Sequence, residues 1–137
     1  MIWTKKLRDI AQEFNVSVYA YVLMDNHYHL ICYFPESAKL PKFIQRLHGS
    51  TAYDINLFDN QTGRKIWHNY WDRLIRDEVD FYTKFNYVHY NPVKHGVVSS
   101  PEKWDFSSYN DHLMKKGEEW MLDCWRSYPV IDYDFEN

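Results

Sequence analysis

Apolar residues near the start of the chain recur first at helical spacing and then at strand spacing. Within residues 3–14, positions i, i+3, i+4 and i+7 are apolar, which predicts an amphipathic helix. These positions are Leu7, Ile10, Ala11 and Phe14. Residues 16–24 and 27–34 are rich in β-branched and aromatic residues, and Asp25 with Asn26 supplies a turn between them. We therefore expect two antiparallel strands joined as a hairpin.

The rest of the chain predicts three more helices. Residues 41–57 place Phe43, Ile44 and Leu47 on one face of a helix. Asp77 is suited to cap a helix over residues 78–91, which Pro92 and Gly96 would end. The aromatic segment 65–75 predicts one or two short strands, and a short helix is expected at residues 107–116. No clear period follows residue 116.

Length and composition indicate one folded domain over residues 1–137. The 137 residues are 45% hydrophobic and 19% aromatic, with only 4 Gly, so a core is expected. The formal net charge of -3 is unevenly placed, with 15 Lys and Arg against 13 Asp and Glu in residues 1–116, and 1 against 6 in residues 117–137. We expect a mildly basic core at 1–116, which permits a phosphate-bearing partner, and an acidic C-terminal tail at 117–137.

Two classes of protein are disfavoured by the sequence. It contains no apolar run long enough to cross a membrane, and its N-terminus lacks the layout of a signal peptide, so we expect a cytoplasmic protein. The only two cysteines, Cys32 and Cys124, lie far apart and form neither a disulfide framework nor a zinc pattern.

The segment MDNHYHLICYF places two histidines, His27 and His29, one residue apart on a predicted strand. Alternate side chains of a strand share one face, so both imidazoles point the same way and can hold a divalent ion if a third ligand arrives from elsewhere. Taken alone, the pair is explained equally well by two rings that pack or form hydrogen bonds on the sheet.

The predicted helix at 78–91 supplies a second polar feature. A helical wheel gathers Phe81, Tyr82, Phe85, Val88 and His89 on a buried face and leaves a narrow polar stripe. The stripe holds Asp80, Lys84, Tyr87 and Asn91, and Tyr87 and Asn91 are neighbours one turn apart. A tyrosine beside a metal site has the chemistry that phosphodiester transfer requires, because phenolate is the nucleophile and the cation offsets charge on the phosphate. Tyr87 by itself is more commonly a surface or interface aromatic.

Four ordered motifs resemble one known family. VLMDNHYHLICYF is similar to "vlMpNHvHLll", IWHNYWDRLIRDE to "vWqrgyydrvIRde", YVHYNPVKHGVV to "YihlNPvraGLv" and WDFSSY to "ypwSSy", and together they cover most of residues 16–112. These are the patterns of the REP-associated tyrosine transposases, within the HUH single-strand DNA endonuclease superfamily. The resemblance implies an α+β fold with a ferredoxin-like antiparallel sheet and helices mainly on one face.

The resemblance also implies roles for individual residues. Tyr87 is the implied nucleophile, and His27, His29 and Asn91 are the implied ligands of Mg²⁺ or Mn²⁺. Such enzymes cut a single strand, leave a 5′-phosphotyrosine link and a free 3′-OH, and need no nucleotide cofactor. The implied partners are single-stranded or hairpin DNA and a second copy of the chain in a homodimer, and the implied location is the nucleoid.

Several basic and aromatic residues are candidates for contacts with DNA. Arg73, Arg76, Lys84 and Lys94 lie on or beside the helix of the tyrosine and can meet phosphates, although solvated surface charge explains each one as well. Trp67, Tyr70 and Trp71 can stack on unpaired bases, but core packing is the commoner role for any single aromatic residue.

The sequence departs from the family at two places, and these departures leave alternatives open. Family members usually open with a strand of the type "yHVt.R", which we expect to be missing here, and Asp25 stands where the family usually has Pro. One alternative is therefore a decayed or domesticated protein that binds hairpin DNA without cutting it. Another is a small metallohydrolase or oxygenase that uses His27 and His29 with a carboxylate such as Asp25.

Overall fold

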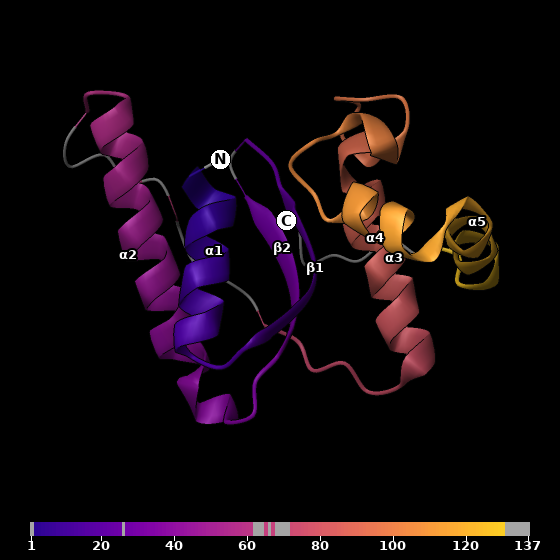
Figure 1. Cartoon of the computed structure of the whole chain (residues 1–137), viewed down its shortest axis with the longest axis horizontal. Helices are drawn as coiled ribbons and strands as arrows, with labels where there is room; N and C mark the ends of the chain where they lie inside the picture. Colours follow the sequence, from indigo (N-terminus) through magenta and orange to yellow (C-terminus); the bar gives the residue numbers. More distant parts are fainter. Residues whose placement is uncertain (1, 26, 62–64, 66, 68–71, 131–137) are drawn as a thin grey trace. The chain divides into compact units, whose positions relative to one another are not determined.

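The computed structural model describes residues 2–25, 27–61, 65, 67 and 72–130. Helix α1 (Ile2–Glu13) is followed by strands β1 (Ser17–Leu23) and β2 (Tyr28–Tyr33), a 3₁₀ turn η1 (Ser37–Lys39) and helix α2 (Leu40–Phe58). Helix α3 (Glu78–Lys94), a 3₁₀ turn η2 (Pro101–Lys103), α4 (Tyr109–Lys116) and α5 (Glu118–Ser127) complete the chain (Figure 1). The protein is an α+β domain with an antiparallel hairpin, which confirms the predicted fold class.

The chain divides into two compact units. The first comprises residues 1–19 and 32–69, and the second comprises residues 20–31 and 70–137. Each strand of the hairpin is thus shared between the units. All residues of the predicted catalytic and metal sites fall in the second unit.

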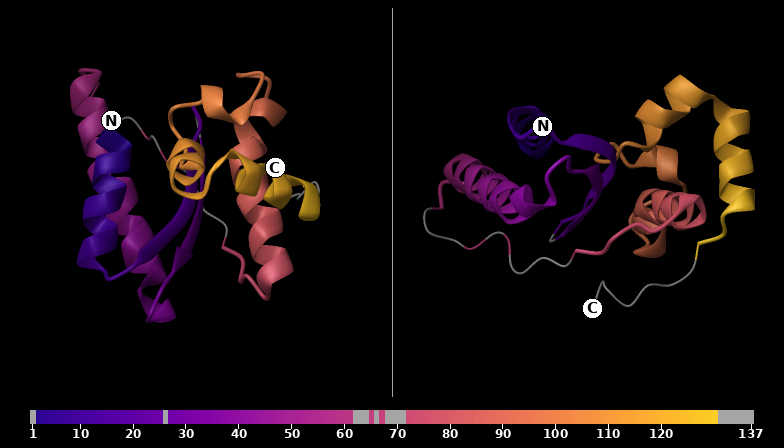
Figure 2. Two further views of the ribbon diagram at one scale, coloured as in Figure 1. Left: turned by 45° about the vertical axis from the view of Figure 1, so that its right-hand side comes forward. Right: turned by 90° about the horizontal axis from the view of Figure 1, so that it is seen from below.

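In the first unit, α1 and α2 lie side by side (Figure 2). Helix α1 ends at Glu13, and Asn15 follows it in the left-handed conformation, with a φ of 58°, that closes a Schellman motif. In this motif the Val16 N–H donates to the Ala11 carbonyl at 2.8 Å. Phe43 of α2 packs edge to face against Phe14 and Phe34, with ring centroids 5.9 and 5.3 Å away. This aromatic contact joins the end of α1 and the end of the hairpin to α2.

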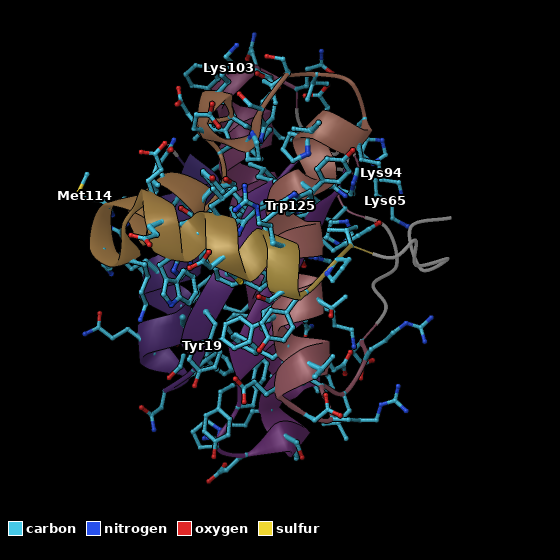
Figure 3. All side chains as sticks on the ribbon, turned by 90° about the vertical axis from the view of Figure 1, so that its right-hand side faces the viewer. Tyr19, Lys65, Lys94, Lys103, Met114 and Trp125 are labelled. Atoms are coloured by element: carbon cyan, nitrogen blue, oxygen red, sulfur yellow. The ribbon has the colours of Figure 1, made fainter. Side chains whose placement is uncertain are left out.

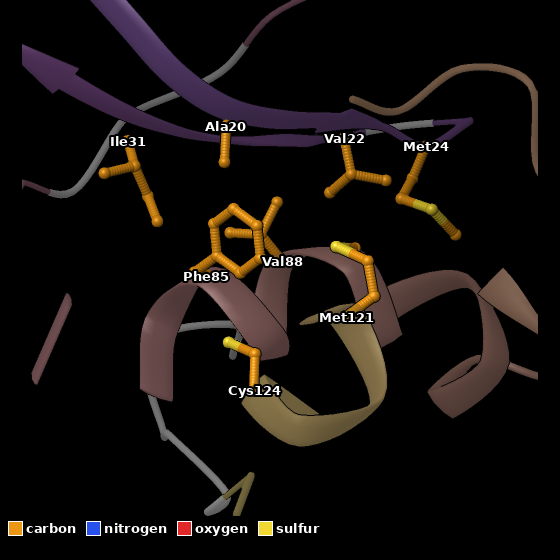
Figure 4. Packing of buried hydrophobic residues seen from close by; sticks show 8 residues of the cluster. All are labelled: Ala20, Val22, Met24, Ile31, Phe85, Val88, Met121 and Cys124. Carbon is orange, nitrogen blue, oxygen red and sulfur yellow. The ribbon is translucent and has the colours of Figure 1, made fainter. Parts of the chain in front are cut away.

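In the second unit, the hairpin packs on α3 and α5. The apolar side chains of the strands face those of the two helices across one core (Figure 4). The buried members are Ala20, Val22, Met24 and Ile31 from the hairpin, Phe85 and Val88 from α3, and Met121 and Cys124 from α5. Burial of apolar surface therefore holds α3 against the hairpin.

The free edge of β1 is covered by the segment that precedes α4. The Leu23 N–H donates to the Phe106 carbonyl at 2.8 Å, the Ser108 N–H donates to the Tyr21 carbonyl at 3.0 Å, and Val22 and Ser107 form an antiparallel bridge. The Trp104 indole donates to the Leu23 carbonyl at 3.0 Å. These bonds satisfy backbone groups that an exposed strand edge would leave to solvent.

The structure corrects three predictions of local structure. Helix α3 continues through Pro92 to Lys94 instead of ending at residue 91. Of the segment 65–75, the described residues 65, 67 and 72–75 lie in no strand, and the others are outside the described residues. The expected acidic tail contains α5, whose Met121 and Cys124 are buried in the core, so at least residues 118–127 belong to the folded unit.

Helix α5 is also tied to α3 by hydrogen bonds. The Asn86 amide donates to the carbonyls of Cys124 and Tyr128, at 3.0 and 2.9 Å. The Cys124 carbonyl also accepts from the Tyr128 N–H at 3.1 Å, and the Tyr128 carbonyl lies just past the end of α5, where helix geometry leaves carbonyls without intrahelical partners. None of the helices in the described part of the chain is long and apolar enough to cross a membrane.

Candidate active site

The hairpin brings the two predicted histidines together. The Met24 N–H donates to the His27 carbonyl at 2.8 Å and closes the turn; β2 then begins at Tyr28, so His29 lies on the strand and His27 just before it. The two imidazole rings meet edge to face with centroids 5.3 Å apart. Their shared side of the hairpin agrees with the prediction from the His-x-His spacing.

Helix α3 places the predicted nucleophile beside this pair. The helix is capped by the Asp77 carboxylate, which accepts from the Asp80 N–H at 2.8 Å. The Tyr87 ring meets the His29 ring edge to face, with centroids 5.8 Å apart. Tyr87 is only 1% exposed. The tyrosine and the histidine pair therefore belong to one site within a single chain.

Asn91 lies one turn after Tyr87 and is completely buried. One turn further along, the His95 ring packs against the His27 ring, with centroids 5.4 Å apart. Tyr87 thus contacts one histidine of the pair and His95 contacts the other, and Asn91 lies midway between them on the same face of the helix. This order places the Asn91 side chain between the two contacts to the histidines.

The donor set of this site fits a divalent cation. Two imidazoles and one amide oxygen, with further positions left for phosphate and water, are suitable ligands for Mn²⁺ or Mg²⁺. Among the described residues, no three His, Cys, Asp or Glu side chains are grouped so that they can hold a metal ion. A third protein ligand from the described residues would therefore be of another type, and Asn91, one turn after Tyr87 on α3, is a candidate. The alternative that combines the histidines with Asp25 is not supported.

Lys94 and His95, at the end of α3, contact the predicted site residues, although neither was predicted to do so. The Lys94 Nζ lies 3.3 Å from the Tyr87 hydroxyl oxygen and 5.1 Å from the centroid of its ring, although Lys94 was predicted only as a DNA contact. His95 was not predicted at all. Both continue the stripe of Tyr87 and Asn91, at seven and eight residues from the tyrosine, and this spacing was the signal available in the sequence.

The other predicted DNA contacts have two different environments. Arg73 and Arg76 are exposed in the segment before α3. Lys84, by contrast, is held in an ion pair with Asp80, at 2.9 Å, and both side chains are only 14% exposed. The hydrogen bond from Lys84 lowers the pKa of Asp80 below its usual range. The ion pair with Asp80 therefore engages part of the donor capacity of the Lys84 ammonium.

Of the three predicted stacking aromatics, Trp67 is among the described residues. Trp67 belongs to the first unit, where its indole donates to the Thr51 hydroxyl at 2.7 Å and its ring stacks on His48. Tyr70 and Trp71 are outside the described residues. The first unit also has a groove of about 650 Å³ along α1 and α2, where Lys6 pairs with Asp54 and Arg46 pairs with Glu13.

A buried histidine on the other face of α3 fixes the helix against the hairpin. His89 is 3% exposed, and its Nε2 lies 2.8 Å from the Ser108 hydroxyl, which also accepts from the Tyr21 N–H at 2.9 Å. Burial, with a contribution from nearby His112, lowers the pKa of His89 to about 3. His89 is therefore neutral near pH 7 and serves as part of the framework that holds the tyrosine in place.

The fold and the site together define a transposase-type domain, in which a histidine pair on a hairpin lies beside a tyrosine on a helix. Residues 3–90 match the model of the family described as "Transposase IS200 like", which is more than half of the chain, and the protein belongs to this family.

Comparison with known proteins gives the same result. The chain is 32% identical over 108 residues to the REP-associated tyrosine transposase of Escherichia coli, a match that covers 77% of this chain and 59% of that protein. It is 44% identical over 46 residues to the "Putative REP-associated tyrosine transposase" of Haemophilus influenzae, with 33% and 26% covered. The chain therefore matches little more than half of one relative and about a quarter of the other.

A solved structure has the same fold. It is described as a REP-associated tyrosine transposase bound to a REP hairpin, and it superposes with a TM-score of 0.77 at 19% sequence identity. The match covers 98% of this chain and 77% of the other.

Proposed function

We propose that this protein cleaves and rejoins single-stranded DNA in a metal-dependent reaction, with Tyr87 as the nucleophile. The observation that carries this proposal is the contact between the Tyr87 and His29 rings, whose centroids are 5.8 Å apart. The His29 ring in turn contacts the His27 ring, with centroids 5.3 Å apart. Membership of the IS200-like transposase family supports it.

His27, His29 and Asn91 are the proposed ligands of the cation, Mg²⁺ or Mn²⁺. When bound, the cation would polarise the phosphate and offset the charge that builds up during transfer. An unassisted tyrosine, with a pKa of about 10, is a weak nucleophile at neutral pH, so its surroundings have to favour attack.

The covalent step is balanced by simple proton movements. The phenolic proton leaves to water, the Tyr87 oxygen forms a bond to phosphorus, and the bond from phosphorus to the 3′ oxygen breaks. The 3′ oxygen takes up a proton, which leaves a 5′-phosphotyrosine link and a free 3′-OH. Attack by another 3′-OH reverses the step and joins the strands, so no nucleoside triphosphate is needed.

The proposed substrate is a single strand beside a hairpin. The solved structure with the same fold is described as bound to a REP hairpin, and both curated relatives are named REP-associated. Arg73 and Arg76, exposed beside α3, are the proposed contacts to the DNA backbone. Two further properties are proposed from the family resemblance alone: a homodimer, which light scattering of the purified protein tests, and association with the nucleoid.

The experiment that tests this function is the capture of a covalent adduct. The protein is incubated with Mn²⁺ and end-labelled hairpin DNA that carries single-stranded flanks, and a labelled protein band is expected in denaturing gels. Tyr87→Phe should abolish the band. Tyr90→Phe is a matched control, because Tyr90 lies on the same helix but packs against Trp125, and it should retain the band. An adduct that persists in Tyr87→Phe would exclude Tyr87 as the nucleophile.

A second candidate function is hairpin binding without cleavage. The observation in its favour is that Tyr87 is 1% exposed, so a phosphate can reach its hydroxyl only after the side chains above it move. Tight hairpin binding with no adduct in Mg²⁺, Mn²⁺ or Co²⁺ would favour this candidate, and robust adduct formation would eliminate it.

A further inference from the structure

The last turn of α3 places the ammonium group of Lys94 beside the side chain of Tyr87. The Lys94 Nζ lies 3.3 Å from the Tyr87 hydroxyl oxygen and 5.1 Å from the ring centroid. Seven residues are about two helical turns, and side chains of a helix lean toward its N-terminus. The Lys94 stem therefore follows the helix surface back to Tyr87 and places the ammonium at the end of the phenol ring.

We propose that Lys94 is a positioning residue for the Tyr87 hydroxyl and not a contact to the DNA backbone. This inference rests on the proposed role of Tyr87 as the nucleophile. An ammonium group has donors only, so the tyrosine oxygen accepts this hydrogen bond and its own hydrogen points elsewhere. The bond therefore fixes the direction from which the ammonium approaches the Tyr87 oxygen and restricts the rotation of the hydroxyl hydrogen.

The same contact suits the reaction electrostatically. During attack the Tyr87 oxygen carries negative charge until its bond to phosphorus is complete, and hydrogen bonds to charged oxygens are about twice as strong as those between neutral groups. An ammonium group already in place needs no rearrangement when this charge develops. When the phosphotyrosine link is attacked by a 3′-OH, the same group faces the tyrosine oxygen as it leaves.

The other basic residues of the site differ from Lys94 in what they contact. Arg73 and Arg76 are exposed before α3, and Lys84 is paired with Asp80 at 2.9 Å. Lys94, labelled at the C-terminal end of α3 in Figure 3, contacts the proposed nucleophile itself. A positioning role therefore separates it from the two exposed arginines.

The experiment measures DNA binding and adduct formation separately. Lys94→Met keeps most of the stem and removes the ammonium, and Lys94→Arg restores a cationic donor. Lys103→Met is the matched control, since Lys103 lies on η2, donates to the Ser99 hydroxyl at 2.8 Å and is well separated from Lys94 in Figure 3. Hairpin affinity is measured over a range of salt concentrations without cleavage, and single-turnover adduct formation is measured at saturating DNA with Mn²⁺.

Lys94→Met is expected to lower the single-turnover rate by about 10- to 100-fold, the cost typical of a misplaced reacting group, while affinity and its salt dependence change less than about twofold. Lys94→Arg should recover part of the rate, and Lys103→Met should match the wild type. A normal rate at saturation in Lys94→Met overturns the proposal, and weaker binding with a salt slope smaller by about one would then identify a phosphate contact. If the wild type forms no adduct, the proposed function itself has failed, whereas an adduct with an unaffected Lys94→Met rate refutes only this inference.

Discussion

The rings of His29 and Tyr87 meet edge to face within one chain, with their centroids 5.8 Å apart. The residue proposed to bind the cation and the residue proposed to attack the phosphate are thus supplied by the same subunit. If the tyrosine of a second copy acted at the histidines instead, the His29 and Tyr87 rings of one chain would not need to be in contact. The arrangement leads to a prediction about mixtures of variants.

Mixing two inactive variants should not restore activity. Tyr87→Phe lacks the proposed nucleophile and His29→Ala lacks a proposed ligand, and each is expected to form no adduct alone. If both groups act within one chain, a mixed dimer has no complete site, so the mixture stays inactive. Adduct formation in the mixture, on the His29→Ala chain, would show that the tyrosine acts on the metal site of its partner.

Loss of the His95 ring should weaken metal binding. His95 packs against His27 with ring centroids 5.4 Å apart, and groups that orient a ligand typically affect metal affinity by about 10-fold or more. His95→Ala is expected to raise the dissociation constant of Mn²⁺, measured by calorimetry without DNA. His95→Phe keeps the ring and should bind Mn²⁺ nearly as well as the wild type. Equal weakening in both variants would contradict a role based on ring packing.

Substitutions of the basic residues on and before α3 should differ in their effect on the salt dependence of hairpin affinity. Arg76→Gln removes an exposed cation, so hairpin affinity should fall and the salt slope should decrease by about one. Lys84→Gln breaks the ion pair with Asp80 and should leave the salt slope unchanged. Fluorescence anisotropy over a salt series measures both. The assignment fails if Lys84→Gln lowers the slope as much as Arg76→Gln.

Acid should destabilise the fold through His89. Burial lowers the pKa of His89 to about 3, so the folded chain resists protonation while the unfolded chain takes up a proton near the ordinary value of 6.5. Stability from this group is therefore complete above about pH 6.5 and is lost as the pH falls toward 3, by about 1.4 kcal/mol per pH unit.

Urea unfolding between pH 4 and 7 measures this effect. His89→Gln is the matched variant, because an amide can still bond the Ser108 hydroxyl but does not titrate. Its free energy of unfolding should fall less steeply with acid than that of the wild type. Equal slopes would mean that other groups cause the acid sensitivity.

The early elements could be predicted from the sequence because burial and periodicity agree there. The apolar face of α1 and the Asn15 stop predict its range to within one residue, and the Asp77 cap is observed as a hydrogen bond. Strand alternation paired His27 with His29, and the helical wheel paired Tyr87 with Asn91, because both rules depend only on local geometry. That the two pairs lie together was implied only by the resemblance to the family, since local geometry does not fix how a helix packs on a hairpin.

The later elements could not be predicted in the same way. Helix α5 buries only Met121 and Cys124, while Leu122 and Trp125 are 44% and 40% exposed, so its apolar period is weak and tertiary packing determines it. Pro92 and Gly96 predict an end of α3 near residue 91, which leaves Lys94 and His95 outside the helical wheel. The helix tolerates Pro92 within its last turn, and as a result its active face is one turn longer than predicted.

The two hydrogen bonds of Asn86 connect α5 to the part of α3 that carries Tyr87. Asn86 directly precedes Tyr87, and its amide is bound to the carbonyls of Cys124 and Tyr128. The turn of α3 that carries the nucleophile is thus braced from behind by residues 38 and 42 positions further along the chain. Removal or displacement of α5 would take away both hydrogen bonds, so we expect it to loosen the turn of α3 that carries Tyr87 although α5 supplies neither the proposed nucleophile nor a proposed metal ligand.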